Sequence, residues 1–334
     1  MSLPDIHYCP GTLAEGNDTY SQACLRRLFN GKKVSHILPY TSPQTSDEDA
    51  EKFMDNRKQI SISGVQEKVS LILEKNKLRL AEEGEQGTYI LKPVPRDLKK
   101  VWLVPANEHL TMQIARQVYG INTAENGLIF FKDGSSAYIT KRFDVKDDHS
   151  KWGKEDFASL AGKTSENSGA NFKYEYSYEE MAQLIQKYVP AAMIEMEKFF
   201  SRVVFNYLFS NGDAHLKNFA LLQTTNGDQI LSPAYDLINT RIHVDDTDFA
   251  LDEGLFTDDF MSDHMLANGR VGVEDFQEFA QRIGISERRR DSLLAPFVER
   301  QPFVEELIHR SFLDEPTKRD YWQHYQMKRD QLDT

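Results

Sequence analysis

Residues 210–240, SNGDAHLKNFALLQTTNGDQILSPAYDLINT, contain a clear turn signal and carry the side chains best suited to chemistry. Asp213, Asn218 and Asp236 offer oxygen atoms of the kind that magnesium prefers as ligands. Asn226-Gly227 is a strong signal for a two-residue hairpin turn, because both residues tolerate a positive φ. The expected strands on either side of this turn are residues 219–223 and 229–232. The stretch therefore predicts a β-hairpin that joins the candidate metal ligands.

The hairpin also predicts which of these ligands meet. If Asn226-Gly227 forms the turn, the numbers of paired residues sum to about 453, so Asn218 lies opposite Tyr235. The amide of Asn218 is then next to the carboxylate of Asp236, and Asp213 lies on the preceding loop at the mouth of the same site. One amide and one carboxylate are a sufficient protein contribution to a magnesium site, and a second carboxylate can receive a proton. This arrangement is typical of an enzyme that uses a magnesium-bound nucleotide.

The composition sets the broad class of protein. The chain has 334 residues, of which 40% are hydrophobic, so it is long enough for two lobes with a sizeable core. A net charge of -12 argues against direct wrapping of nucleic acid, which needs a concentrated basic face. The sequence has no apolar run long enough to span a membrane and no N-terminal signal pattern, so we expect a cytoplasmic protein. Cys9 and Cys24 are then expected to be reduced thiols.

A β-rich lobe is expected over residues 59–145, after an N-terminal extension of residues 1–58. The loop SISG, residues 61–64, leads into a strand in which apolar residues alternate from Val69 onward, and Lys68 lies where that strand begins. Taken alone, the loop is an ordinary turn before a strand. Two hydroxyl groups beside the glycine, together with the lysine, favour a loop that covers phosphate groups.

Lys92 and Glu108 are candidates for an ion pair in this lobe. A second strand ends at Lys92, and a helix over residues 106–120 follows, with Asn107 as its expected N-cap. A surface lysine, and a glutamate that complements the dipole of its helix, are the simpler interpretations. Protein kinases, however, hold the nucleotide phosphates with a strand lysine and a helix glutamate in this order.

A hairpin over residues 127–131 and 136–143 completes the sheet of this lobe, which then has about five strands. In a two-lobed nucleotide enzyme, the end of such a strand is where a hinge meets the adenine. Phe143 lies at that end and is a candidate apolar wall, although a lone phenylalanine is more often part of the core.

From residue 146 onward the pattern is mainly helical. Helices are expected over residues 178–188 and 193–209, and three or four more from Val273. The sequence therefore predicts an α+β, protein-kinase-like fold with two lobes. The small N-terminal lobe is β-rich with one key helix, and the larger C-terminal lobe, residues 146–334, is expected to be all helical.

The residue types and spacings suit phosphoryl transfer. The spacing from Asp213 to Asn218 is that of the catalytic loop of protein kinases, in which the aspartate receives a proton and the asparagine binds metal. Asn211-Gly212 replaces the usual His-Arg, and Asp236 is followed by Leu-Ile rather than Phe-Gly. The candidate phosphate contacts are Lys92, Lys68 and His215. The roles match the kinase pattern better than the letters do.

Six motifs between residues 61 and 237 occur in the order SISGVQEK, ILKP, NEHLTMQIA, KRFD, NGDAHLKNF and SPAYDL. Each motif is weak alone, but together they resemble the HipA-type serine/threonine kinase toxins of bacterial toxin-antitoxin systems. The resemblance implies ATP and Mg²⁺ as cofactors, Asp213 as the catalytic base, and Asn218 and Asp236 as metal ligands. It implies nucleotide contacts at Lys68, Lys92, His215 and Tyr235, and a hinge near Lys141 and Phe143. With Glu108, Ser63 and Gly64 these residues make up the expected nucleotide site, and Ser61 and Ser63 are the expected autophosphorylation sites.

The resemblance also implies targets and partners. The targets of this family are aminoacyl-tRNA synthetases, whose inactivation stops translation and growth. Residues 1–60 alone precede the phosphate loop, as in the shorter HipT-type toxins of three-component systems, where tryptophanyl-tRNA synthetase is the known sort of target. In those systems a separate small protein resembles the missing N-terminal part and acts with a helix-turn-helix DNA-binding protein. DNA is then reached only through the antitoxin.

Two other functions stay open. The first is a catalytically weak, kinase-like binding module that acts as an antitoxin partner or co-repressor. The presence of Asp213, Asn218, Asp236 and Lys92 together argues against it. The second is a metal-dependent phosphodiesterase, which would need more clustered histidine and aspartate ligands.

Overall fold

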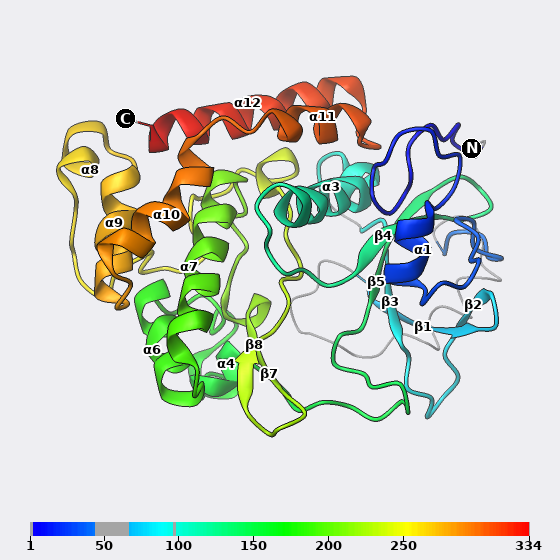
Figure 1. Ribbon diagram of the computed structural model, residues 1–334, viewed down its shortest axis with the longest axis horizontal. Helices are drawn as coiled ribbons and strands as arrows, with labels where there is room; N and C mark the ends of the chain where they lie inside the picture. Colours follow the sequence, from blue (N-terminus) through cyan, green and yellow to red (C-terminus); the bar gives the residue numbers. More distant parts are fainter. Residues whose placement is uncertain (1–2, 44–66, 96–97, 334) are drawn as a thin grey trace.

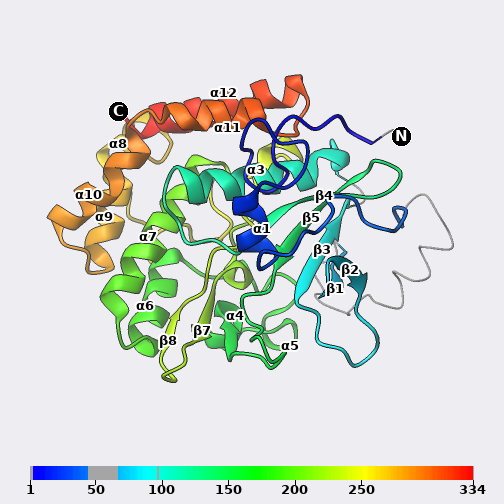
Figure 2. The same cartoon turned by 45° about the vertical axis from the view of Figure 1, so that its right-hand side comes forward.

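The structure is a computed structural model that describes residues 3–43, 67–95 and 98–333 (Figure 1). A sheet with strands β1 to β5 forms one end of the molecule, and helices α6 to α10 form the other. Helices α11 (Pro302–Arg310) and α12 (Glu315–Leu332) run along one side of both parts (Figure 2). The arrangement is a mixed α and β fold with two lobes, as the sequence predicts. No helix among the described residues is both long and apolar enough to cross a membrane.

The five-stranded sheet is antiparallel, and its strands lie in the order β2-β1-β3-β5-β4. The strands are β1 (Val69–Glu74), β2 (Lys77–Leu80), β3 (Tyr89–Pro93), β4 (Asn126–Phe130) and β5 (Ser136–Lys141). Alternating side chains give the sheet two apolar faces. For example, Tyr138 of β5 belongs to the core shared with the large lobe, whereas Ile139 belongs to a second core with the N-terminal segment.

The described part of the N-terminal extension packs on that second face. Helix α1 (Gln22–Leu28) begins after Ser21, whose hydroxyl accepts a hydrogen bond from the Cys24 amide. Tyr20 and Phe29 join the core under the sheet, and the Tyr20 hydroxyl donates to the Leu128 carbonyl of β4. Cys9 and Cys24 are free thiols, both buried. The segment therefore covers the sheet rather than forming a separate unit.

Helix α3 (Val104–Gln117) lies on the other face of the sheet, preceded by the short 3-10 helix η1 (Val101–Leu103). The expected N-cap at Asn107 is wrong, because the helix already begins three residues earlier with Pro105 in its first turn. Asn107 is therefore inside the helix and fully buried. Glu108 does not belong to the first turn, so the helix dipole does not explain its position.

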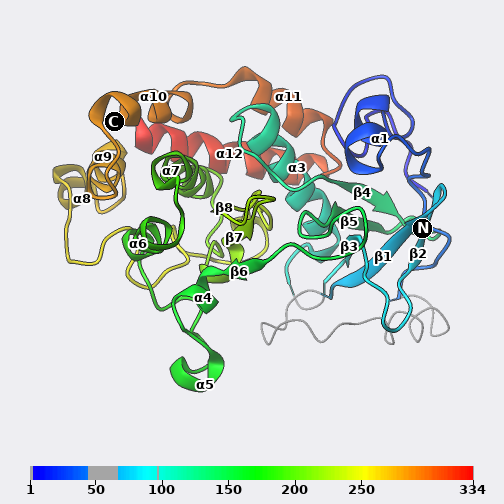
Figure 3. The same cartoon turned by 60° about the horizontal axis from the view of Figure 1, so that its bottom comes forward.

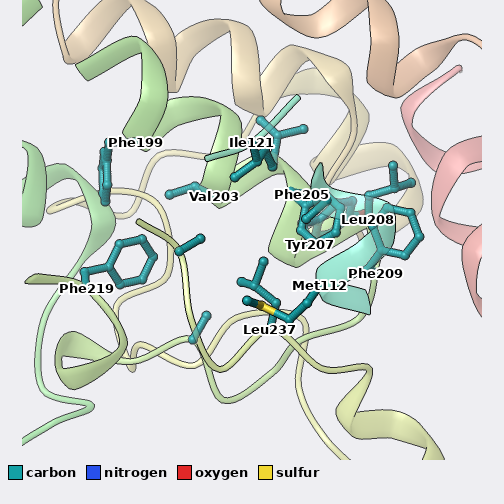
Figure 4. Packing of buried hydrophobic residues seen from close by; sticks show 14 of the residues in the cluster. Met112, Ile121, Phe199, Val203, Phe205, Tyr207, Leu208, Phe209, Phe219 and Leu237 are labelled. Atoms are coloured by element: carbon teal, nitrogen blue, oxygen red, sulfur yellow. The ribbon is translucent and has the colours of Figure 1, made fainter. Parts of the chain in front are cut away.

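The large lobe is built on α6 (Tyr178–Tyr188) and α7 (Ala192–Leu208), close to their expected limits. The inward face of α7 is apolar and aromatic, and Phe199, Phe205 and Leu208 lie in the main core (Figure 4). The remaining helices are α4 (Phe157–Leu160), α5 (Ser165–Ser168), α8 (Asp263–Asn268), α9 (Val273–Arg282) and α10 (Glu287–Val298), with α11 and α12.

The expectation of an all-helical C-terminal lobe is wrong. The lobe contains a three-stranded antiparallel sheet in the order β6-β7-β8, which lies between α6 and the larger sheet (Figure 3). Its strands are β6 (Lys154–Asp156), β7 (Ala220–Gln223) and β8 (Gln229–Leu231). Strand β6 is short and polar, so its sequence shows no alternation that would mark it as a strand.

The β7–β8 hairpin exists, but its register differs by one residue from the expected one. Gln223 pairs with Gln229, and the Thr224 amide donates to the Asp228 carbonyl at 2.8 Å. The loop therefore has three central residues, and Gly227 adopts a left-handed φ of 87°. A three-residue loop with glycine at its left-handed position is the next most common hairpin connection. The pairing ends near Ala220 and Ser232, and Asn218 lies before the strand in a 3-10 helix, so the expected pairing of Asn218 with Tyr235 is wrong.

Candidate active site

The two lobes meet at an ion-paired cluster of Lys92, Glu108 and Asp236. Lys92 of β3 places its Nζ 2.6 Å from Glu108 Oε1 of α3 and 2.5 Å from Asp236 Oδ1 of the large lobe. The side chains of Lys92 and Glu108 are 5% and 2% exposed, and that of Asp236 is 27% exposed. The structure therefore brings together the strand lysine and the helix glutamate that the sequence indicates as a candidate ion pair. It adds the Asp236 carboxylate from the opposite lobe.

Local structure explains why Lys92 reaches this position. It pairs with Tyr138 in the β3–β5 register, so both side chains lie on the sheet face that α3 covers. Its Nζ lies 5.2 Å from the centre of the Tyr138 ring. Solvent cannot hydrate a buried ammonium, and the strand partner of Lys92 carries no charge to balance it. The carboxylates of Glu108 and Asp236 therefore stabilise the ammonium here.

The charges in this cluster depend on one another. Burial alone would raise the pKa of Asp236, but Lys68 at 3.4 Å and Lys92 lower it well below its usual range. Burial would lower the pKa of Lys92, but Asp236 and Glu108 raise it above its usual range. Burial raises the pKa of Glu108, although Lys92 opposes the shift. Asp236 is thus held ionised between two ammonium groups.

The backbone around Asp236 is held in an uncommon conformation. Asp236 has a left-handed φ of 56°, which few residues other than glycine adopt without a specific support. The next residue, Leu237, is buried in the same core as Met112 of α3 (Figure 4). The Asn211 side-chain amide donates to the Asp236 carbonyl at 3.5 Å. These contacts fix the direction of the Asp236 carboxylate.

A buried amide ties α3 to the same segment. The Asn107 side chain donates to the Asn239 carbonyl at 2.8 Å and accepts from the Asn239 amide at 3.2 Å. Its nitrogen also lies 2.9 Å from His243 Nε2. Nothing in the sequence marks this role of Asn107, since an asparagine near a helix start more often caps the helix. Asn107 and Glu108 together couple α3 to the turn after Asp236.

Asp213 lies on the loop between α7 and the short 3-10 helix η2 (Leu216–Asn218), and its side chain is half exposed. The Tyr174 hydroxyl donates to Asp213 Oδ1 at 2.8 Å. Although the side chain is half exposed, the protein atoms around its carboxyl group reduce its hydration and raise the pKa of Asp213, while Lys173 and the Tyr174 hydrogen bond lower it. His215 is buried with its Nε2 3.7 Å from Asp213 Oδ1, and burial lowers the pKa of its ring to about 3.

The loop is packed too tightly for a larger residue at Gly212. A Cβ added there would lie 2.5 Å from Asp246 Oδ2 and 2.6 Å from the Thr247 carbonyl oxygen. The Gly212 amide donates to the Thr240 hydroxyl at 2.9 Å. This close approach explains why glycine precedes Asp213, where protein kinases commonly have arginine.

Asn218 and Asp236 have the donor atoms that a magnesium ion requires. Asn218 ends η2, and the Tyr235 hydroxyl donates to the carbonyl of Lys217 at 2.9 Å, which joins the two segments. An ionised carboxylate and an amide oxygen fit magnesium, which prefers oxygen ligands and retains water. Among residues 3–43, 67–95 and 98–333, no group of three or more His, Cys, Asp or Glu side chains is arranged to hold a metal ion.

Phe143 and Tyr235 form an aromatic wall near this site, with their ring centres 5.7 Å apart. Lys154 of β6 lies over both rings, at 5.4 Å from Phe143 and 5.0 Å from Tyr235. Lys141 is not part of this group, because its Nζ donates to Asn30 of the N-terminal segment at 2.7 Å. No sequence signal marks Lys154, because the short polar strand β6 that carries it shows no strand pattern.

Three predicted residues lie outside the described part of the chain. They are Ser61, Ser63 and Gly64 of the expected phosphate loop. Their roles stay predictions. Lys68, four residues after Gly64, is described and lies beside Asp236.

A lysine of a β-rich lobe, paired with a helix glutamate and facing a carboxylate of a helical lobe, is the arrangement of protein-kinase-like folds. Residues 60–302 match the family model described as HipA-like C-terminal domain. The chain belongs to this family.

Relatives in sequence agree with this assignment. The chain is 27% identical over 313 residues to a protein of Haemophilus influenzae named "Putative kinase", with 89% of this chain and 88% of that protein covered. It is 30% identical over 210 residues to a Sinorhizobium fredii protein named "Putative kinase Y4dM". That match covers 58% of this chain and 48% of the relative.

Solved structures show the same fold. HipA of Shewanella oneidensis, solved in a complex with HipB and operator DNA, matches with a TM-score of 0.62 at 20% identity. The match covers 87% of this chain and 72% of HipA. The Helicobacter pylori proinflammatory kinase CtkA matches with a TM-score of 0.50 at 16% identity, over 78% of this chain and 93% of CtkA.

Proposed function

We propose that the protein is an ATP-dependent serine/threonine kinase of the HipA type. The contact of Lys92 with both Glu108 and Asp236 carries the proposal, because it joins the phosphate-binding pair of one lobe to the metal-binding carboxylate of the other. The family, and relatives named as kinases, support the same reaction.

Each residue of the site has a role in this proposal. When bound, magnesium ATP supplies the phosphoryl group, and Asn218 and Asp236 would hold the metal. Lys92 and Lys68 neutralise phosphate charge, and Glu108 keeps Lys92 in place.

Asp213 accepts the proton of the attacking hydroxyl, for which its half-exposed carboxylate is accessible. Phe143 and Tyr235 line the nucleotide side of the site. His215 joins them from the loop that carries Asp213, residues 209–218, which we call the catalytic loop. Lys141 is the weakest of the expected nucleotide contacts, because its side chain bonds to Asn30 of the segment on the other face of the sheet.

The biological role that we propose is that of a toxin in a toxin-antitoxin system. The structural likeness to HipA, solved with HipB and operator DNA, supports antitoxin partners and an indirect link to DNA. We propose an aminoacyl-tRNA synthetase, and in the HipT-like case tryptophanyl-tRNA synthetase, as the target. Autophosphorylation at Ser61 or Ser63 would add negative charge beside the phosphates of ATP and so weaken nucleotide binding.

A synthetase panel tests this function. The wild-type protein is incubated with magnesium ATP and purified aminoacyl-tRNA synthetases, and phosphorylated residues are located by mass spectrometry. Phosphate on a serine or threonine of one synthetase, absent with Asp213→Asn, is the expected result. Wild-type protein that leaves every synthetase and itself unmodified, but binds its antitoxin, would instead indicate the kinase-like binding module.

A further inference from the structure

A segment between α5 and α6 contacts the catalytic loop, although it contains none of the residues that the sequence motifs marked. The Leu216 amide donates to the Lys173 carbonyl at 3.1 Å, which joins the two backbones. The Tyr174 hydroxyl donates to Asp213 Oδ1 at 2.8 Å, and Lys173 Nζ lies 2.9 Å from His215 Nε2. Two adjacent side chains of one segment therefore bind two members of the loop.

These hydrogen bonds have a defined direction. A lysine ammonium has only donors, so His215 Nε2 must accept from Lys173, and a neutral His215 ring then carries its proton on Nδ1. Tyr174 donates to Oδ1 of Asp213, and within the described residues Oδ2 has no such hydrogen bond, so Oδ2 is the oxygen better placed to receive a proton. The segment thus fixes one of the two carboxylate oxygens of Asp213 by a hydrogen bond.

The segment is itself anchored. The Asp252 amide donates to the Tyr174 carbonyl at 2.9 Å, and the Tyr174 ring packs edge-on against His215 with centres 5.3 Å apart. Lys173 is only 9% exposed, and lysine is rarely so buried unless a carboxylate pairs with it. Its burial beside the loop indicates a role there.

We propose that Tyr174 and Lys173 are positioning residues for phosphoryl transfer, which hold the catalytic loop and Asp213 with Oδ2 toward the substrate hydroxyl. This inference rests on the proposed kinase function. Neither residue needs to contact the substrate, since both act through Asp213 and His215.

The charged groups around Asp213 determine how its pKa responds to substitution. Lys173, Lys68 and the Tyr174 hydrogen bond favour the ionised carboxylate, whereas burial and Asp236 oppose it. The charged and titratable groups on the neighbouring elements are Lys68, Lys173, Tyr174, His215, Lys217, Asp236, Asp246 and Asp252. Removal of the Tyr174 hydroxyl or the Lys173 charge therefore raises the pKa of Asp213 further. The acid limb of the rate profile then moves to higher pH.

The test compares Tyr174→Phe and Lys173→Met with two matched controls from the same region, Tyr176→Phe and Lys163→Met. Transfer of the γ-phosphate is followed as kcat and KM across roughly pH 5 to 9. We expect kcat to fall by about tenfold or more in Tyr174→Phe and Lys173→Met, with an acid limb shifted upward by about half a pH unit or more. Lys173→Arg, which keeps the charge, should restore the position of the limb. The two controls should retain the wild-type limb.

A second readout does not depend on activity. In protein labelled with ¹³C at aspartate carboxyl carbons, the Asp213 signal is identified by its loss in Asp213→Asn, and its pKa is measured by NMR. A higher Asp213 pKa in Tyr174→Phe and in Lys173→Met supports the inference. An unchanged Asp213 pKa and acid limb in both variants, with transfer by the wild type intact, would overturn it. Absence of transfer by the wild type would count against the proposed function instead.

Discussion

The substitution Lys92→Met tests the buried ion pair through its dependence on pH. It removes the ammonium 2.6 Å from Glu108 Oε1, whose side chain is 2% exposed, and leaves an acid that must be neutral to stay buried. With an ordinary pKa of 4.5, keeping Glu108 protonated at about pH 7.5 costs about 4 kcal/mol, at 1.36 kcal/mol per pH unit. At about pH 5 the same cost is about 1 kcal/mol.

The sign of this dependence follows from the raised pKa of the buried acid. A carboxyl group whose folded pKa lies above its unfolded value favours the folded state at low pH, and this advantage is lost as the pH rises. The loss of stability caused by Lys92→Met should therefore grow from pH 5 to neutrality. Loss of the Lys92 contact to Asp236 adds a destabilisation that is about equal at both pH values, because a carboxylate with a lowered pKa gives its full stabilisation above its ordinary pKa of 3.8.

Urea unfolding at both pH values, followed by tryptophan fluorescence, measures this change. The double variant Lys92→Met, Glu108→Gln is the control, because a neutral amide removes the titrating group and should flatten the pH dependence. Lys163→Met is a matched single control for loss of a lysine. If Lys92→Met destabilised the protein equally at both pH values, the buried ion pair would not be the source of the stability.

Further substitutions test separate contacts. Asn107→Ala should lower the free energy of unfolding by about 2 to 3 kcal/mol, because the backbone groups of Asn239 lose their partner; a change within error in urea unfolding would count against this. Gly212→Ala should lower kcat, because a Cβ at this position displaces Asp246, while the circular dichroism spectrum stays unchanged. A kcat equal to that of the wild type would contradict the tight packing around Gly212. Lys68→Met should weaken ATP binding, measured by calorimetry, by about tenfold. Little stability should be lost, because the Lys68 side chain is partly exposed. An unchanged affinity for ATP would show that Lys68 is not a nucleotide contact.

Much of the small lobe could be predicted because its signals are local. Alternation in β1, an apolar run that ends in Lys92, and helical spacing after it are visible within short windows of sequence. The contact of Lys92 with Glu108 follows once the helix packs on the sheet. The predicted start of α3 is wrong because asparagine is a favoured N-cap residue. The Asn107 side chain instead donates to the carbonyl of Asn239.

The errors in the large lobe have different physical causes. The register of the β7–β8 hairpin depends on whether Asn226-Gly227 forms a two-residue turn or the end of a three-residue loop, and both suit the same sequence. Strand β6 forms because its backbone pairs with β7, and its polar side chains give no period-two signal. Tertiary pairing decided both features.

Tyr174 and Lys173 could not be found from sequence at all. They lie 39 and 42 residues before Asp213 and His215, their respective partners, in a segment with no regular structure. Only the fold places them beside the catalytic loop. Tyrosine and lysine in a polar segment are otherwise typical of an exposed surface.

Transfer of phosphate from γ-labelled ATP, measured together with nucleotide affinity, shows whether this site is a kinase centre. The wild type and Asp213→Asn are compared in the same buffer with magnesium, with and without an acceptor protein. The structure predicts that Asp213→Asn binds nucleotide about as well as the wild type but transfers phosphate at least about 100-fold more slowly. Equal transfer by the two proteins, or none by the wild type, would contradict the assignment of this site as a kinase centre.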